Sequence, residues 1–409
     1  IKFKRSRTVE VSDASTAEHT SAADTVAGNG DLLTEILLRL PIRSLLRFKS
    51  VSKHWLSLIT NPHFSLLRNP HPNPPSGLFL HRSLYHGNPN FEWVPLDDTQ
   101  NPTNKAPFGS LNSIHDPSGI KILQSCNGLL CCCSFRVHGP KRSYYIHNPT
   151  TKQFTTLPRV STTVYGVNLA FDPSKSPHYK VVCVRGSELV PEHYQIEIYS
   201  SDTGPWRVSG RPFTANPNTQ FNCGVYWNGA IHWVSPWGDS LYFNVDEERL
   251  ETMPMPPVRN SRDVRMIKYF GESRDHLHLV QIYERPFSTQ FNVYEIERDY
   301  SNWFVKFRVD LDEVPTVFPE MIRKLHQWGS GDYAFALLSL VRGEKDEDSF
   351  LVLCIPGMAI RYNFVDKTFR KLCDFAPSPH DIEGIDILDS LLLGGWYSAF
   401  QYIESLSCV

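Results

Sequence analysis

The sequence lacks the features that membrane-spanning and secreted proteins require. No apolar run approaches the roughly 18 residues of a membrane span, and Tyr333–Val341 is about the longest. The N-terminus has no apolar signal core, and every Asn-x-Ser/Thr triplet contains the forbidden proline. Nine cysteines, three of them consecutive at Cys131–Cys133, form a poor disulfide framework. We therefore expect a soluble protein of the cytoplasm, the nucleus or both, with no membrane partner.

The sequence also has no marked excess of charge of either sign. Lys and Arg number 41 against 43 Asp and Glu, a net charge of −2, so neither a global polyanion-binding surface nor a nucleic-acid partner is expected. With 41% hydrophobic residues there is ample material for a core, which excludes wholesale disorder. Thirty prolines and 23 glycines predict many turns, so long helices are not expected to dominate.

Sequence motifs that carry catalysis are missing as well. There is no G-x-S-x-G elbow, no H-E-x-x-H pair and no phosphate-binding glycine-rich loop. The acidic groups Asp246–Glu248 and Asp381/Glu383 fall at predicted turns, where paired-carboxylate catalysis has no support. We expect no intrinsic catalysis and no cofactor.

Two groups of candidate metal ligands are better explained as structural residues. Cys126 and Cys131–Cys133 have apolar neighbours, and consecutive residues of a strand point to opposite faces, so these thiols cannot converge on one tetrahedral ion. His276 and His278 share one strand face, but the sequence places no third ligand beside them. We predict buried, inert thiols, a solvated or core histidine pair, and no metal site.

Residues 31–69 differ in kind from the rest of the chain. A polar stripe at i, i+4 and i+8 (Asp31, Glu35 and Arg39) runs through residues that are otherwise almost all apolar, which predicts a helix that Pro41 ends. A second helix is predicted to follow, with Ser44 as its candidate N-cap and Asn61-Pro62 as its stop. Its apolar residues recur at three- and four-residue spacing on one face: Phe48, Val51, Trp55 and Leu58.

These two predicted helices carry more apolar surface than a unit of about 40 residues can bury by itself. The excess either packs on the following domain or forms a docking face for another protein. From Asp31 to Trp55 there are five basic and two acidic residues, and the resulting local balance of +3 favours an acidic partner.

The segment DLLTEILLRLPIRSLLRFKSVSKHWLSLITNPHF, which starts at Asp31, resembles an F-box of the plant type. The resemblance rests on the Asp-Leu-Leu start, the Arg-Leu-Pro corner at 39–41, the Val-Ser-Lys triplet at 51–53 and the Asn-Pro-x-Phe close at 61–64. It implies docking on the acidic Skp-type adaptor of a cullin–RING ubiquitin ligase. Carried over by position, the residues implied to form or support the adaptor-facing surface are Leu32, Leu33, Ile36, Leu37, Leu40, Pro41, Leu45, Leu46, Val51 and Trp55.

One part of the F-box pattern is missing. The usual F-box opens with Leu-Pro three residues before Asp-Leu-Leu, and Gly28-Asn29-Gly30 stands there in this chain. Part of the first adaptor contact is therefore absent. We expect a lower affinity for the adaptor, with binding retained.

The remaining sequence predicts a disordered tail, a linker and a large β domain. Residues 1–28 are rich in Ser, Thr, Ala and Asp without periodicity and form the tail, residues 29–69 the F-box, residues 70–76 a Pro-rich linker, and residues 77–409 the β domain. A weak repeat recurs there at Ile146, Ile198, Tyr242, Tyr294 and Tyr362, with intervals of 52, 44, 52 and 68 residues. We attribute the longest interval to the acidic loop at 344–348.

Four strands per copy at this period are typical of propeller blades. Strand-like runs near both ends of the domain give material for six or seven blades, and the chain ends are predicted to share one blade. The predicted fold class is mainly β: a small N-terminal helical F-box followed by a six- or seven-bladed kelch-like β-propeller. A double-sheet sandwich is the alternative. The segment also resembles the F-box-associated, kelch-like domains of plant F-box proteins through the SCNGLLCC run (125–132), the Asn-Pro-Thr turn (148–150) and the FQYIESL ending (400–406).

Exposed aromatic residues are the candidate contacts for a target protein, because loops cluster at the rim of a propeller and Trp is a typical hot-spot residue. Trp237 and Trp328 stand beside glycines in turn-like context and are the predicted target-binding residues. The predicted function is that of a non-catalytic substrate receptor of a Skp–cullin–F-box ubiquitin ligase. One alternative is an adaptor-binding scaffold or inhibitor that assembles no productive ligase. The other is a propeller enzyme or lectin with a vestigial F-box.

Overall fold

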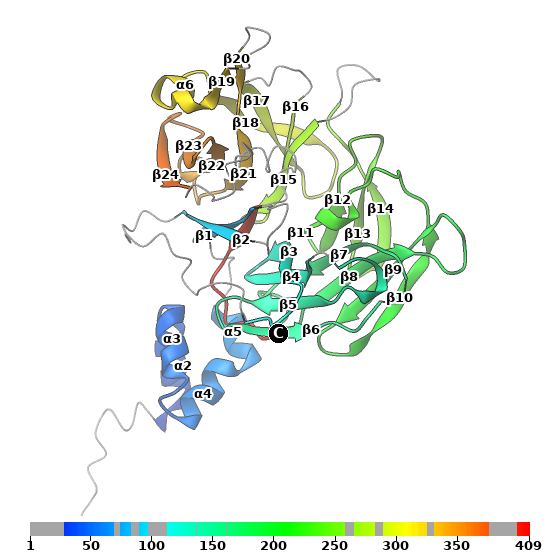
Figure 1. The fold of residues 1–409 in the computed structure, drawn as a ribbon. Coiled ribbons are helices and arrows are strands. Elements are labelled where there is room, and N and C mark those ends of the chain that lie inside the picture. The colour runs from blue at the N-terminus through cyan, green and yellow to red at the C-terminus, as the bar shows by residue number, and fades with distance from the viewer. Residues whose placement is uncertain are drawn as a thin grey trace, which may run out of the picture. The chain divides into compact units, whose positions relative to one another are not determined.

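The structure is a computed structural model. It describes residues 28–68, 74–82, 90–96, 113–135, 137–160, 162–257, 266–282, 289–324, 331–375 and 399–409 (Figure 1). The chain divides into two compact units, Ile1–Phe64 and Ser65–Val409. Nearly all of the predicted tail and residues 70–73 of the predicted linker lie outside the described ranges. Within these ranges, no helix combines the length and apolar character that a membrane crossing needs.

The first unit is helical. Its helices are α2 (Gly30–Leu38), α3 (Ile42–Phe48) and α4 (Lys53–Thr60), and α5 (Pro62–Arg68) continues past its boundary. Asn29 caps α2, since its side-chain Oδ1 accepts the backbone N–H groups of Asp31 (3.1 Å) and Leu32 (3.2 Å). Pro41 directly precedes α3, in agreement with the predicted end of the first helix. The residue that replaces part of the usual F-box opening thus starts the helix.

The prediction of one continuous second helix is wrong. The segment forms α3 and α4, and Ser44 lies inside α3 instead of capping it. Ser52 is the real N-cap: its backbone is extended, and its hydroxyl accepts the backbone N–H of Trp55 at 3.1 Å. The apolar spacing was misleading because Phe48 and Trp55 still meet, edge to face at 5.2 Å between centroids, although they belong to different helices.

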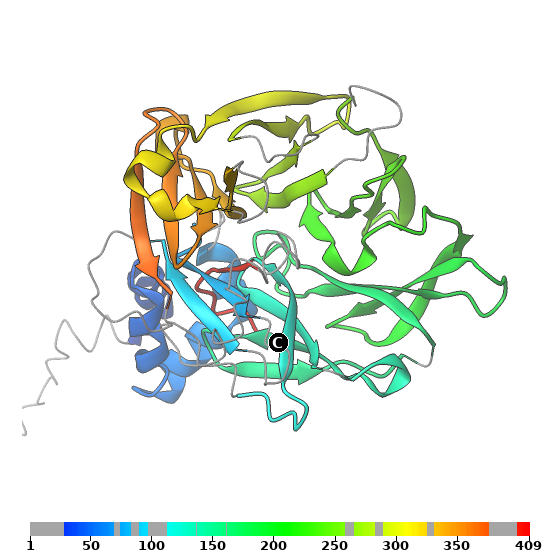
Figure 2. The same ribbon diagram turned by 45° about the horizontal axis from the view of Figure 1, so that its top comes forward.

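Six of the seven β-sheets in the described residues of the second unit surround a common axis, as Figure 2 shows. Blade 1 contains β3 (Ile120–Cys126), β4 (Leu129–Ser134), β5 (Tyr144–Asn148) and β6 (Gln153–Thr156). Blade 2 contains β7 (Val164–Ala170), β8 (Lys180–Gly186), β9 (Tyr194–Ser200) and β10 (Gly204–Phe213). Blade 3 contains β11 (Val225–Trp227), β12 (Ala230–Trp233), β13 (Ser240–Asn244) and β14 (Arg249–Met253).

The remaining three blades complete the ring. Blade 4 contains β15 (Met266–Ser273), β16 (His276–Ile282), β17 (Gln290–Ile296) and β18 (Trp303–Asp310). Blade 5 contains β21 (Ala336–Val341), β22 (Phe350–Ile355), β23 (Met358–Asn363) and β24 (Phe369–Asp374). Blade 6 contains β1 (Gly77–Arg82), β2 (Asn90–Pro95) and β25 (Ala399–Tyr402). All pairings within blades are antiparallel, and the strands nearest the axis are β3, β7, β11, β15, β21 and β25.

Blade 6 confirms that the two ends of the domain share one sheet. The last strand, β25, pairs with β1 in the register Gly77↔Tyr402 to Leu80↔Ala399. The three motifs that suggested the domain family meet at this closure. Asn148 donates to the carbonyl oxygens of Ser405 (3.1 Å) and Ser407 (2.7 Å), while Gly128 lies against the same terminal segment.

The hydrophobic core is divided among the blade interfaces. Six clusters of buried residues each join two neighbouring sheets. Because side chains alternate along a strand, Cys131 and Cys133 enter the cluster between blades 1 and 2, whereas Cys132 enters the one between blades 6 and 1. Every blade is therefore apolar on both faces, which fits a ring of sheets and excludes the two-sheet sandwich.

Two tryptophans tie the outer edges of neighbouring blades together. Nε1 of Trp206, in blade 2, donates to the carbonyl of Pro158, which follows blade 1, at 2.8 Å. Nε1 of Trp303, in blade 4, donates to the carbonyl of Pro254, which follows blade 3, at 2.7 Å. The Leu-Pro, Met-Pro and Trp residues that recur in the repeat thus link neighbouring blades by hydrogen bonds.

The long repeat interval has a different cause from the predicted one. Between β18 and β21 lie a one-turn helix, α6 (Val314–Val317), and a two-stranded sheet of β19 (Ile322–Lys324) and β20 (Gly331–Tyr333). This insertion lengthens the interval, because the acidic loop spans only a short turn between β21 and β22. Four short 3₁₀ helices complete the described secondary structure: Gly139–Lys141, Phe221–Cys223, Pro319–Met321 and Asp346–Asp348.

Candidate functional site

The ten predicted adaptor-binding residues divide into core and surface. Leu33, Leu37 and Leu45 are buried and form the apolar interior of the helical unit together with Ile42 and Ile59. They can support an interface, but in this structure they present no surface to a partner.

The surface group is apolar and exposed. Leu32, Ile36 and Val51 have 48%, 45% and 58% of their area exposed, and Pro41 is exposed as well. The remaining predicted residues are half-buried: Leu40, Leu46 and Trp55. Leu32 and Ile36 are four residues apart on α2, so they lie on one face of that helix. We call Leu32, Ile36 and Val51 the apolar surface of the helical unit.

Basic groups accompany this apolar surface. Arg39, Arg43, Arg47 and Lys53 are exposed. An ion pair on α2, Arg39 Nη2 to Glu35 Oε2 at 3.4 Å, is largely exposed at both ends and contributes little to stability. The local positive balance predicted from the sequence is therefore presented to solvent.

On the propeller, the structure places one of the two predicted target-binding tryptophans. Trp237 lies in the β12–β13 loop with 45% of its area exposed, and its backbone N–H donates to Ser235 Oγ at 3.3 Å. Gly238 beside it has a φ of +68° and approaches Asn216 of the β10–β11 loop. Trp328 lies outside the described residues.

Other exposed apolar residues lie on blade 2, at the same end of the propeller as Trp237. Leu189 and Val190, in the β8–β9 loop, are exposed, Leu189 to 83%. Exposed Tyr165, at the start of β7, packs edge to face on Tyr194, at the start of β9, with 5.0 Å between ring centroids. We call Tyr165, Leu189, Val190 and Trp237 the rim residues of blades 2 and 3.

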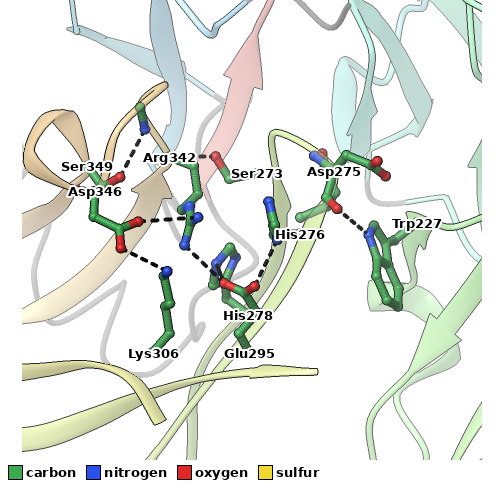
Figure 3. Close-up of polar contacts among 12 residues, drawn as sticks. Trp227, Ser273, Asp275, His276, His278, Glu295, Lys306, Arg342, Asp346 and Ser349 are labelled. Carbon is green, nitrogen blue, oxygen red and sulfur yellow. Dashed lines mark hydrogen bonds and ion pairs between the residues drawn. The ribbon is translucent and has the colours of Figure 1, made fainter. Parts of the chain in front are cut away.

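The predicted histidine pair forms part of an ionic cluster between blades 4 and 5 (Figure 3). His276 Nδ1 lies 2.8 Å from Glu295 Oε1, and His278 Nε2 lies 3.2 Å from Glu295 Oε2. Arg342, which follows β21, reaches the same carboxylate with Nη1 at 3.0 Å and Asp346 with Nη2 at 3.4 Å. The histidines thus share a face, as predicted, and their third partner is a carboxylate from the neighbouring strand.

The cluster is held in one charge state by its surroundings. Burial alone would raise the pKa of Glu295, but hydrogen bonds from His276 and His278 outweigh it and hold this pKa well below its usual range. Burial lowers the pKa of His278, which favours the neutral ring. Within the described ranges, no group of three or more His, Cys, Asp or Glu residues has a metal-binding arrangement. The cluster therefore acts as an ionic link between two blades.

The cysteines are isolated thiols. Eight of the nine are buried, and Cys408 is exposed. Burial raises the pKa of Cys126, Cys131 and Cys132 far above the usual thiol value, so these groups stay protonated and unreactive. They fill the interfaces on both sides of blade 1.

The acidic turn of blade 3 is a set of surface ion pairs. Glu248 binds Arg207 and accepts a hydrogen bond from Ser209 at 2.7 Å, while Asp246 pairs with Lys180 at 2.8 Å. These carboxylates link blade 3 to blade 2 and do not face one another across a site. The other acidic group considered, Asp381/Glu383, lies outside the described residues.

The positions of three charged residues in these sites could not be predicted from the sequence, because no local pattern marks them. Glu295 occupies an ordinary strand position, and Arg342 directly follows an apolar strand. Glu272 is the penultimate residue of β15 and lines a cavity at the axis of the propeller. Only the packing of strands and turns from different blades brings such positions together.

Comparison with known families identifies both units. Residues 30–67 match the F-box domain family, and residues 87–273 match the family described as F-box associated beta propeller domain. The F-box protein At5g07610 of Arabidopsis thaliana is 39% identical, with 95% of this chain and 94% of that protein covered. The putative F-box protein At4g38870 of the same plant is 30% identical over 59% of this chain and 60% of its own length.

Two solved structures to which this chain is similar are distant in sequence. A chain of a nidogen/laminin complex has 12% identity and a TM-score of 0.37, with 74% of this chain and 93% of that chain covered. A protein from Lactobacillus plantarum has 11% identity and a TM-score of 0.41, with 74% of this chain and 83% of its own covered. The assignment therefore rests on the sequence families and on the relative that matches almost end to end. The chain belongs to the plant F-box proteins that carry an F-box associated beta propeller domain.

Proposed function

We propose that this protein is the substrate receptor of a Skp–cullin–F-box ubiquitin ligase, and that it works in the cytoplasm, the nucleus or both. The helical unit would bind the Skp-type adaptor, and the propeller would hold a target protein. Catalysis of ubiquitin transfer would belong to other subunits.

The observation that carries this proposal is the exposed apolar surface of Leu32, Ile36 and Val51 next to exposed basic groups. A helical unit whose buried leucines already fill its core has no structural need for three large apolar side chains in solvent. An acidic adaptor with an apolar groove would cover these side chains and would be steered by the positive charge around them.

The proposed mechanism is proximity. A target held on the propeller stays near the charged ubiquitin enzyme, so that the transfer becomes effectively intramolecular. The rim residues of blades 2 and 3 are our candidates for target contact. They come from two loops and from the start of β7 on a rigid scaffold, and they include Trp237, an aromatic side chain of the type that dominates protein interfaces.

Adaptor capture by the co-expressed full-length chain tests the docking assignment. We expect Ile36→Asp to weaken adaptor binding roughly tenfold or more, because it places a charge at the centre of an apolar contact. Leu45 is unsuitable for this test because it is buried, and a charge there would unfold the unit. Val365→Asp is the matched control, since Val365 is an equally exposed apolar residue of the propeller. Equal capture by the Ile36→Asp and Val365→Asp variants would disprove the docking assignment.

The same purification separates the alternative functions. Recovery of adaptor, cullin and RING subunit with the chain supports a ligase receptor. Recovery of adaptor without cullin supports a scaffold or inhibitor. Recovery of neither adaptor nor cullin supports a propeller enzyme or lectin with a vestigial F-box. Proximity labelling by the full-length chain, compared with an F-box deletion, would then identify target proteins.

A further inference from the structure

A cavity of about 110 Å³ lies at the axis of the propeller. Its lining comes from the innermost strands of five blades, β3, β11, β15, β21 and β25, and from residues next to them. A space of this size holds several water molecules or the end of one long side chain. Because it is built on rigid strands of separate blades, its shape is fixed by the fold.

Glu272 is the only residue among the described cavity lining that can carry a charge near neutral pH. Burial raises the pKa of the Cys126 and Tyr226 side chains well above their usual values, and raises that of Cys223 and of Tyr269 to about 12. These four groups therefore stay neutral. The cavity combines one carboxyl group with neutral polar and apolar side chains.

One oxygen of the Glu272 carboxyl group is held by a hydrogen bond, and the other can still accept one. Its Oε1 accepts the backbone N–H of Asp275 at 2.6 Å, a bond that closes the turn between β15 and β16. Among the described residues, none donates a hydrogen bond to its Oε2. Gln401 Nε2 lies 3.5 Å from the backbone carbonyl oxygen of Glu272 and 3.3 Å from Ser339 Oγ, so the polar neighbours that line the cavity beside Glu272 are neutral.

The two arginines that share a pocket with Glu272 are already paired with other acids. Arg274 and Arg342 line the small pocket that adjoins the cavity. Arg274 Nη2 lies 3.1 Å from Glu344, and Arg342 binds Glu295 and Asp346. Burial raises the pKa of Glu272 to about 7. The charge interaction with His276 lowers this pKa, and that with Asp172 raises it further. Among the described residues, Glu272 thus forms no ion pair of its own.

We propose that this cavity binds the ammonium or guanidinium end of a lysine or arginine side chain, with Glu272 as its counter-ion. The proposal rests on the proposed function in one respect, since the side chain would belong to the bound target protein. The apolar lining, which includes Leu123 and Phe270, would pack on the methylene groups of that side chain. A free organic amine has the same chemistry, and the experiment below separates the two sources.

The test measures binding of three small probes to the purified full chain, at constant ionic strength. The probes are n-butylammonium, n-butanol as its neutral counterpart, and Nα-acetyl-lysine N-methylamide as a side chain attached to a backbone. We expect both cations to bind and butanol not to bind. Equal binding of butanol and butylammonium would overturn the proposal.

Two variants locate the binding. Glu272→Gln keeps the Oε1 acceptor for Asp275 and removes the charge, and we expect it to weaken butylammonium binding roughly tenfold or more. Glu247→Gln, at an exposed turn of blade 3, is the matched control and should bind as the natural chain does. Unfolding curves confirm that both variants are folded. Unchanged affinity in Glu272→Gln would refute the site.

The pH profile gives a second readout. A Glu272 pKa of about 7 leaves roughly a tenth of the group ionised at pH 6 and nine tenths at pH 8, so the natural chain should bind butylammonium about tenfold more tightly at pH 8. The other charged groups around it, Asp172, His276, Arg274 and Arg342, remain in Glu272→Gln, so this variant shows any pH effect that they cause. An equal pH effect in both proteins would contradict the role of Glu272.

The probe attached to a backbone separates the cation site from the proposed function. If butylammonium binds and the blocked lysine does not, the cavity is a site for a free amine, and the contact with a target side chain is refuted. Adaptor capture is measured independently, so loss of adaptor binding with intact cation binding would count against the ligase function alone.

Discussion

The pH dependence of folding provides a quantitative test of the blade 3 structure. His232 is fully buried on β12; its Nε2 lies 2.8 Å from the hydroxyl of Tyr300, and its ring stacks on Tyr242 at 5.6 Å between centroids. Burial lowers its pKa from 6.5 to about 4, against a smaller opposite effect of the carbonyls of Val225 and Ala230. The folded chain thus holds this histidine neutral where the unfolded chain would protonate it.

The sign of the effect follows from this difference. Because the pKa is lower in the folded state, the contribution of His232 to stability is complete above pH 6.5 and is lost as the pH falls towards 4. Between pH 7 and pH 5 the linkage relation gives a loss of about 2 kcal/mol. For a unit of this size, with an unfolding entropy of roughly 0.7 kcal/mol/K, that corresponds to about 3 °C in melting temperature.

The assay compares thermal unfolding of the natural chain and of His232→Gln at both pH values. Glutamine keeps hydrogen-bonding groups but does not titrate, so the drop in melting temperature from pH 7 to pH 5 should be about 3 °C smaller in the variant. Any constant destabilisation of the variant cancels in this comparison. His147, in blade 1, also has its pKa lowered to about 4 by burial, but it titrates in both proteins. Equal drops in both proteins would refute the reasoning.

Three further predictions test the closure, the ionic cluster and the thiols. Gly128→Ala should cost about 1–3 kcal/mol in unfolding free energy, because the φ of Gly128 is +89° and an added Cβ would lie 2.5 Å from the Cβ of Ser405. Gly204→Ala is the control: φ is +96° there but the space around it is open, so this variant should show the backbone cost without the steric clash. Arg342→Met should cost about 3–5 kcal/mol by denaturant unfolding because it removes the arginine that pairs with the buried Glu295, and a loss below about 1 kcal/mol would contradict a structural role for this cluster. In a thiol-labelling assay counted by mass spectrometry, Cys408 should react in the native chain and all nine cysteines after denaturation; rapid native labelling of several thiols would contradict their burial.

Local sequence patterns were sufficient for the fold class and for the F-box. Helix α2 and its end before Pro41 could be predicted because apolar periodicity and proline act over a few residues. The break between α3 and α4 could not, since it depends on the Ser52 hydroxyl capping one helix while Phe48 and Trp55 pack across the two. The same spacing fits one long helix or two short ones.

For the propeller, the pattern of residues was enough to predict that about 330 residues would form repeated short strands with apolar faces, because side chains alternate along every strand. The tertiary structure decided that there are six blades, that α6 and its neighbouring strands interrupt the repeat, and that Gly128, Asn148 and Ser405 meet where the ring closes. It also decided which residues face the axis, and so placed Glu272 in a cavity and Glu295 beside Arg342. Such meetings depend on the packing of whole sheets against one another, which no local pattern of residues records.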